Sequence, residues 1–203
     1  MSIDLVPQPA VTGRAFDHAR VQSLVGELLE AFGEDPNREG LRDTPRRVAD
    51  AWRERLCYDP GRTGTVFDSE TLTVGGSELV IVNGIVLSST CEHHLHPMRL
   101  VATVGYRPAD CVVGLSKIPR IAERHAHRLQ LQERIARGIA DDLMATARTK
   151  DVGVVIRGEH LCMTQRGVRA DQARSNSVLL HGCFDEDPHA ARWLRDAARE
   201  AAA

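Results

Sequence analysis

Aromatic residues are scarce in this chain: two Trp, two Tyr and four Phe make up only 4% of its 203 residues. A hydrophobic core must therefore be built mainly from Val, Leu, Ile and Ala. Hydrophobic residues nevertheless reach 42% and charged residues 27%, a balance typical of a soluble globular protein. The length suffices for one domain with a sizeable core, or for one domain with a helical appendage.

Long apolar runs, a large net charge and paired cysteines are also missing. The net charge of −2 excludes a broadly cationic nucleic-acid binder but leaves room for a local basic pocket. The longest apolar stretch, residues 79–87, is interrupted by Asn83-Gly84 and is too short to span a bilayer. The first residues lack the basic and apolar regions of a secretory signal, and the five dispersed cysteines do not suggest a disulfide scaffold. We therefore expect a cytoplasmic protein with neither nucleic acid nor membrane as its partner.

The hydrophobic period changes along the chain from helical to strand-like. After an expected disordered lead at 1–13, the region 14–60 predicts two helices, from Ala15 to near Gly33 and from Thr44-Pro45 to Leu56. The order of the later elements favours an α+β fold with an antiparallel sheet. Strands are expected at 71–74, 78–88, 100–106, 112–115, 152–163 and 177–184, and helices at 116–127, 130–147 and 187–200.

One thiol and three imidazoles lie within residues 91–96, and a second His and Cys pair follows at His160 and Cys162. A single Cys or His is usually an ordinary buried side chain, but two such groups favour a metal, and three or four N/S ligands suit zinc. In an extended strand His160 and Cys162 share a face, as do Cys91 and His93. A turn at 92–93 would instead bring His94 beside Cys91. The spacing does not choose between these two histidines.

Basic residues collect downstream of this segment. Lys117 and Arg120 stand at the start of an expected helix that Ser116 can cap, where backbone N–H groups and the helix dipole favour anions. Arg166 follows Cys162 by four residues. Together these residues suggest that a polyphosphate binds beside the metal.

A carboxylate opens the next expected helix at Glu133. Acidic side chains are common in a first helical turn because they interact favourably with the helix dipole. Alternatively, this carboxylate could accept the paired N–H donors of a guanine edge. The spacing supports both interpretations equally.

Five segments, in this order along the chain, strongly resemble the GTP cyclohydrolase I family. The N-terminal segment resembles that family's N-terminal signature, and the other four contain the Cys, His, Arg and Glu residues discussed above. The match extends from about residue 20 to the C-terminus. The segments are GEDPNREGLRDTPRRVA (33–49), STCEHHLHP (89–97), GLSKIPRI (114–121), RLQLQER (128–134) and HLCMTQRGV (160–168).

This resemblance implies a zinc enzyme. It implies that Cys91, His94 and Cys162 hold the zinc, and that His93 and His160 transfer protons. It further implies hydrolytic opening of the GTP imidazole ring at C8, release of formate, and rearrangement to 7,8-dihydroneopterin triphosphate, the first step of folate and pterin biosynthesis. The residues that it implies for the triphosphate and the guanine are Ser116, Lys117, Arg120 and Arg166, and Gln132 and Glu133, respectively.

The resemblance also implies an architecture. The family adopts the tunnelling fold (T-fold), an antiparallel sheet with two helices on one face, here preceded by N-terminal helices. We therefore expect a T-fold catalytic domain at 61–203 and a homodecamer with active sites at subunit interfaces. The closing segment 170–178 departs from the family pattern, and two alternatives stay open. One is a divergent zinc hydrolase that acts on a related nucleotide in a deazapurine or pterin pathway, and the other is a non-enzymatic, zinc-stabilised assembly module.

Overall fold

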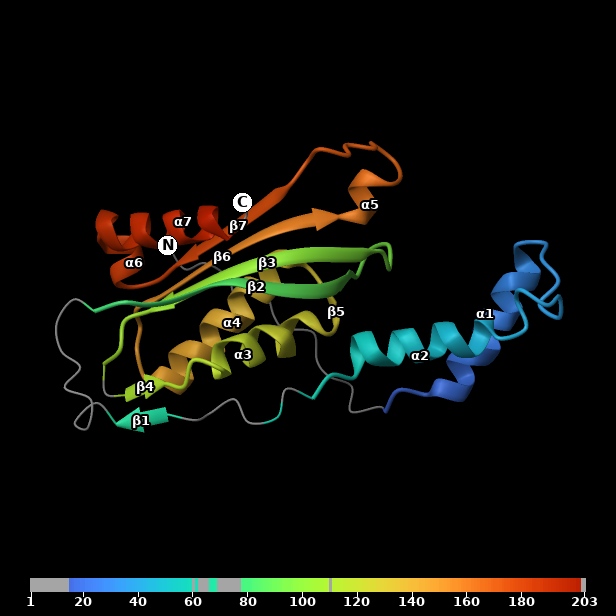
Figure 1. Cartoon of the computed structure of the whole chain (residues 1–203), viewed down its shortest axis with the longest axis horizontal. Coiled ribbons are helices and arrows are strands. Elements are labelled where there is room, and N and C mark those ends of the chain that lie inside the picture. Colours follow the sequence, from blue (N-terminus) through green and yellow to red (C-terminus); the bar gives the residue numbers. More distant parts are fainter. Residues whose placement is uncertain (1–14, 60, 62–65, 69–77, 110, 202–203) are drawn as a thin grey trace. The chain divides into compact units, whose positions relative to one another are not determined.

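The computed structural model describes residues 15–59, 61, 66–68, 78–109 and 111–201, and the chain divides into two units between Tyr58 and Asp59. Figure 1 gives the elements of both units. The expected lead at 1–13 and the strand expected at 71–74 lie outside the described residues. The assignment of 14–60 as a helical region and of 61–203 as a catalytic domain remains a prediction. Across the described residues, every helix is too short or too polar to cross a membrane.

The N-terminal unit consists of the helices α1 (His18–Ala31) and α2 (Thr44–Leu56). The Asp17 side chain caps α1 by accepting a hydrogen bond from the backbone N–H of Arg20 at 3.0 Å. The sequence also predicts Thr44 as the N-cap of α2, but the N-cap is Asp43, and its side chain makes no capping bond. Pro45 in the first turn still helps α2 to begin there, because its fixed φ suits a helix and its missing N–H is not needed.

Helix α1 keeps some of its apolar side chains exposed, while others, such as Val21, Val25 and Leu29, are half-buried. None of its residues is buried, and Leu24, Leu28 and Phe32 at its C-cap are 50%, 49% and 70% exposed. The apolar residues that recur at helical spacing in the sequence therefore form a face of α1 that is partly exposed to solvent in the described part of the chain. Contiguous apolar side chains on a protein surface are typical of a protein–protein interface.

A five-stranded sheet forms the centre of the second unit, in the order β5-β2-β3-β6-β7. All neighbours pair antiparallel except β5, whose two residues pair parallel with the end of β2. This confirms the predicted α+β fold and antiparallel sheet, with β5 as an unexpected parallel addition. The strands are β2 (Val80–Cys91), β3 (Pro97–Tyr106), β5 (Leu129–Gln130), β6 (Val152–His160) and β7 (Ser175–Leu180), while β1 (Val66–Asp68) and β4 (Cys111–Val113) form a separate pair.

Helices cover both faces of the sheet (Figure 1). Helices α3 (Lys117–Ala126) and α4 (Gln132–Ala147) lie on one face, as predicted, and α6 (Cys183–Glu186) and α7 (Pro188–Glu200) on the other. Because side chains alternate along a strand, β6 contributes to both cores. Val154 and Ile156 belong to the cluster under α3 and α4, whereas Val155 packs with Phe184 and Leu194. Aliphatic residues and alanine dominate both clusters, as the scarcity of aromatics requires.

Three predicted boundaries are wrong in ways that matter for the site. The helix expected from residue 130 begins at Gln132, because residues 129–130 add to the sheet as β5. The strand expected to reach residue 163 ends at His160, and α5 (Leu161–Thr164) follows at once. The strand expected at 177–184 is β7, which ends at Leu180 before α6.

A partly exposed hydrogen bond joins α3 to α4. His125 Nε2 lies 2.9 Å from Asp142 Oδ2, and Gly138 leaves room for the imidazole, because a Cβ at that position would collide with the ring. The Asp142 pKa is lowered, chiefly by the hydrogen bond from His125. A carboxyl group with a lowered folded-state pKa stabilises the protein above its unfolded pKa of about 3.9 and loses that effect as the pH falls through the folded value.

We expect Asp142→Asn to lower the free energy of unfolding by about 1 kcal/mol at neutral pH, because this half-exposed bond is partly screened by solvent. The difference from the unmodified chain is largest near neutral pH, begins to shrink as the pH falls through the unfolded pKa of about 3.9, and disappears only below the lowered folded-state pKa, where the native carboxyl group is protonated too. Urea denaturation at several pH values measures it. Asp141→Asn, at the exposed neighbouring carboxylate, serves as the control, and a difference that persists in acid would contradict the assignment.

Candidate metal centre

The turn between β2 and β3 decides which histidine lies beside Cys91. Strand β2 ends at Cys91, and the chain reverses before β3 begins at Pro97. The backbone N–H of Leu95 donates to the Cys91 carbonyl oxygen, and the Cys91 N–H donates to that of His96, both at 2.9 Å. Leu95 adopts a left-handed backbone with φ 56°, which closes the turn. Of the two geometries that the sequence allows here, a continued strand and a turn at 92–93, the structure has the turn.

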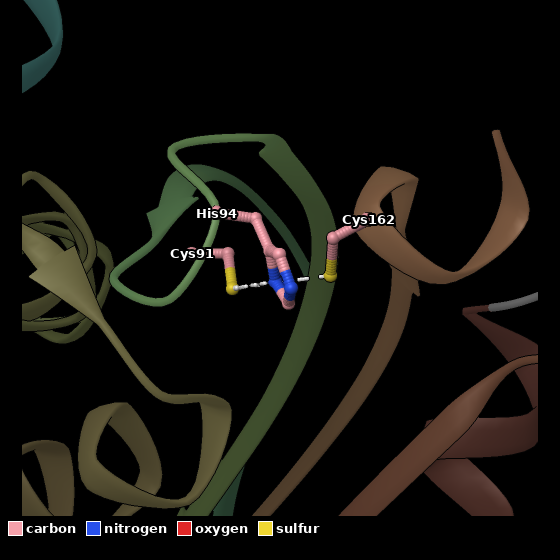
Figure 2. A group of neighbouring side chains, drawn as sticks. All are labelled: Cys91, His94 and Cys162. Carbon is pink, nitrogen blue, oxygen red and sulfur yellow. Dashed lines mark hydrogen bonds between the residues drawn. The ribbon is translucent and has the colours of Figure 1, made fainter. Parts of the chain in front are cut away.

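Two thiols and one imidazole converge at this turn (Figure 2). Cys91 Sγ lies 3.9 Å from His94 Nδ1 and 3.8 Å from Cys162 Sγ, and the three ligand atoms lie within 4.8 Å of one another. Cys91 is buried, Cys162 partly buried and His94 exposed, so one side of the cluster faces solvent. His93 is exposed and does not belong to the cluster. These three side chains could hold a metal ion.

Cys162 reaches the cluster from a helical turn, not from a strand. Because β6 ends at His160, the argument that residues 160 and 162 share a strand face does not apply. The Cys162 pKa is raised by burial and by the neighbouring Cys91, while the charge of Arg166 acts weakly in the opposite direction. Arg166, one of the four residues predicted to contact the triphosphate, therefore acts by its charge on Cys162 of the same chain.

His160 ends β6 on the side of the sheet that faces α4. Its Nε2 lies 2.7 Å from Gln132 Oε1 at the start of α4. Burial lowers the His160 pKa, and the carboxylate of Glu133 acts in the opposite direction. Glu133 itself is exposed. The structure thus brings together His160, Gln132 and Glu133 at the end of β6, two residues before the candidate ligand Cys162.

The side chain of Gln132 is buried, and every hydrogen-bonding position of its amide is engaged. Nε2 donates to the Ile156 carbonyl oxygen at 2.9 Å and to Ser177 Oγ at 3.0 Å. Oε1 accepts from Ser175 Oγ at 2.6 Å in addition to its contact with His160. Sequence reasoning missed this arrangement, although the two serines stand in the segment where the chain departs from the family pattern.

An ion pair that the sequence did not reveal links α4 to the turn at residues 91–96. Arg134 Nη1 and Nη2 lie 2.6 Å and 3.3 Å from the two carboxylate oxygens of Glu92. The two side chains are only 11% and 27% exposed, so solvent screens the pair weakly. The hydrogen bond with Arg134 is the main cause of the lowered Glu92 pKa. Because Glu92 directly follows Cys91, this pair restrains the backbone that presents the thiol.

The other phosphate-binding candidates stand in the N-terminal half of α3, away from the end that is bonded close to Cys91. Ser116 is the N-cap of α3 without a capping side-chain bond, and Lys117 is the first helical residue. The opposite end of α3 is bonded to β2 two residues before Cys91, because Ser89 Oγ donates to the Ala126 carbonyl oxygen at 2.6 Å. An α-helix rises 1.5 Å per residue, so about 15 Å separate the two ends of α3. Arg120 lies one helical turn after Lys117 and is therefore closer to the N-terminal end of α3 than to its C-terminal end.

A groove of about 470 Å³ runs between α4 and the edge strand β7. Its walls include the carboxylate residue Glu133 on one side and Val178 and Leu179 on the other, so it combines a polar group with apolar surface. Small-molecule sites commonly have this size and this mixture of groups. None of the three side chains of the metal cluster lines it.

Comparison with known proteins identifies relatives over most of the chain. The family model described as GTP cyclohydrolase I matches residues 21–198. The GTP cyclohydrolase 1 of Mycobacteroides abscessus is 46% identical over 182 residues, which cover 87% of each chain. That of Mycobacterium ulcerans is 47% identical over 184 residues, covering 88% of this chain and 89% of the relative. That of Hyperthermus butylicus is 45% identical over 172 residues, covering 84% and 86%.

Proposed function

The chain belongs to the GTP cyclohydrolase I family and is an enzyme of that type, and from this premise we propose that it opens the imidazole ring of GTP at C8. The products are formate and, after rearrangement of the ribose, 7,8-dihydroneopterin triphosphate. The observation that carries the proposal is the convergence of Cys91, His94 and Cys162 within 4.8 Å beside His160. The sheet with two helices on one face is consistent with the tunnelling fold of this family.

The cluster fits zinc in its donor atoms and in its spacing. Two sulfurs and one nitrogen form a donor set typical of catalytic zinc, which leaves the fourth position open. With Zn–S bonds of about 2.3 Å in a tetrahedron, two thiolates stand about 3.8 Å apart. This equals the observed separation of 3.8 Å between the sulfurs of Cys91 and Cys162. When bound, the metal supplies a Lewis acid that activates water for hydrolysis at neutral pH.

Two histidines are proposed to move the protons of the reaction. His93 is exposed beside the metal ligand His94, with the two rings edge to face at a centroid distance of 6.2 Å. His160 lies two residues from Cys162. Imidazole can both donate and accept protons near neutral pH, and ring opening requires protonation of the purine as water attacks C8.

Substrate recognition is proposed to use charge at the triphosphate and hydrogen bonds at the base. Glu133 would accept the paired N–H donors of guanine, and the groove beside it has the volume for a purine. Arg166 would bind phosphate close to the metal, where its charge already acts on Cys162. Ser116, Lys117 and Arg120 would bind the triphosphate at the N-terminus of α3.

The length of α3 supports a site shared between copies of the chain. Its first turn lies about 15 Å from its last turn, and the last turn is the end that Ser89 bonds close to Cys91 in the chain, so Lys117 of the same chain is poorly placed to reach a nucleotide at the metal. A second copy can bring its own α3 to the site. The exposed apolar residues of α1 also suit a homo-oligomer. We propose a homodecamer, as the family resemblance implies, in a cytoplasmic location.

Mixing two inactive variants is expected to restore activity if the site is shared. Lys117→Ala removes the phosphate contact from one chain, and Cys162→Ala removes the metal from the other. After joint refolding or co-expression, up to about a quarter of the sites receive both intact parts from neighbouring chains. Formate release by the mixture measures the recovery, with each variant alone as the control. Absence of recovery in mixed oligomers of unchanged size would contradict a shared site.

The function itself is tested by assaying the purified protein with GTP, with its metal content measured in parallel. We expect one zinc per chain, stoichiometric formate and the fluorescence of the oxidised pterin product. Formate or a formamide intermediate without pterin would indicate a different nucleotide hydrolase. A zinc-loaded protein without turnover would indicate an assembly module instead.

A further inference from the structure

We infer that Gln132 is a positioning residue, which holds His160 in one orientation and one tautomer for proton transfer. The inference rests on the proposed function, because it assigns a partner to a histidine of that site. It differs from the guanine contact that the family resemblance implies for Gln132. The 2.7 Å contact between Gln132 Oε1 and His160 Nε2 is its starting point.

The orientation of the Gln132 amide is fixed by its other partners. The carbonyl oxygen of Ile156 can only accept, so the amide atom 2.9 Å from it must be Nε2. A flipped amide would place two oxygens against each other. The Ser175 hydroxyl, 2.6 Å from Oε1, completes this arrangement by donating to the oxygen. Oε1 therefore faces His160 as a pure acceptor.

An acceptor at Nε2 determines the protonation pattern of the imidazole. An amide oxygen has no hydrogen to donate, so His160 Nε2 must carry the proton. In the neutral ring this leaves Nδ1 as the only nitrogen that can accept one. The same logic applies wherever a ring nitrogen of a functional histidine is fixed by a hydrogen bond from its other nitrogen.

The surrounding strands are shaped for this contact. Gly158 on β6 leaves the space that Gln132 occupies, because a Cβ there would collide with Oε1. Ser175 and Ser177 point hydroxyl groups at the amide from β7, on the same sheet face as His160. Four hydrogen bonds thus hold one buried side chain, and no donor or acceptor of its amide remains for a nucleobase.

The test compares Gln132→Met with Glu133→Gln in the zinc-loaded protein. We expect Gln132→Met to keep its zinc and to bind GTP with a dissociation constant within about threefold of the unmodified chain, while kcat falls about 10- to 100-fold. Glu133→Gln, at the proposed guanine contact, should instead weaken GTP binding. Gln130→Met is the matched control: it removes an equally buried glutamine that does not contact His160, and kcat should not fall.

Two results would overturn the inference. One is a kcat of Gln132→Met within threefold of the unmodified value, and the other is a loss of GTP affinity that accounts for the whole loss of kcat/KM. If Gln132→Met does not fold, the unmodified enzyme labelled with ¹⁵N-histidine still decides the question by solid-state NMR, with His160→Asn to assign the signals. A protonated Nε2 and a bare Nδ1 support the inference, and the reverse tautomer refutes it. Failure of the proposed function would show separately, as a zinc-loaded unmodified protein that releases no formate from GTP.

Discussion

Cys162→Ala is expected to lose both the zinc and the activity. Only Cys91 and His94 would remain, and zinc in proteins rarely binds stably to two ligands. The loss of affinity should exceed the roughly 10- to 100-fold that follows from changing residues around a metal site. Metal analysis after dialysis, together with formate release from GTP, measures both effects. Because α5 is a single turn beside the core, we expect the fold to persist, which circular dichroism can check.

A matched control for this variant is Cys57→Ala, at an exposed cysteine outside the cluster. It should retain zinc and turnover. If Cys162→Ala retained a full complement of zinc, the proposed ligand set would be wrong, whatever happened to the activity.

His93→Ala is expected to keep the zinc and to lose turnover. The structure separates this histidine from the cluster, in which His94 Nδ1 lies 3.9 Å from Cys91 Sγ. Removal of a general acid or base usually lowers kcat by roughly 10²- to 10⁴-fold. Zinc content and single-turnover formate release should therefore diverge in this variant.

His94→Ala provides the contrasting case, because it removes a proposed ligand rather than a proton carrier. It should lose zinc and activity together. The opposite pattern, with zinc lost in His93→Ala and retained in His94→Ala, would assign the two neighbouring histidines in reverse.

Local sequence patterns predicted most of the fold and much of the site. Alternating apolar residues identified β2, β3 and β6, and helical spacing identified α3, α4 and α7, because each of these elements buries one regular face. The pairing of distant Cys and His residues also located the metal cluster. The spacing left His93 and His94 as alternatives, since residues 91–96 fit both a continued strand and a reversal; the family resemblance implied His94, and the turn brings that side chain beside Cys91.

Other features depended on contacts that no local pattern encodes. The helical turn around Cys162 begins inside an apolar stretch that continues β6, and β5 is too short to show alternation. The pair Glu92 and Arg134 joins residues far apart in sequence, and neither residue type is informative alone. The burial of Gln132 likewise depends on Gly158, whose missing side chain is visible only once β6 and α4 lie together.

Both faces of strand β6 pack against a hydrophobic core, so insertions and deletions within the strand are expected to disrupt the fold. Its even-numbered residues from Val152 to His160 face the core under α4 and the site, and Val155 faces the core under α7. Because side chains alternate with a period of two, one inserted or deleted residue would exchange the two faces. It would move His160 to the side of α7 and bury charged Arg157 where Ile156 now lies. Changes of length within this strand are therefore not expected to be tolerated.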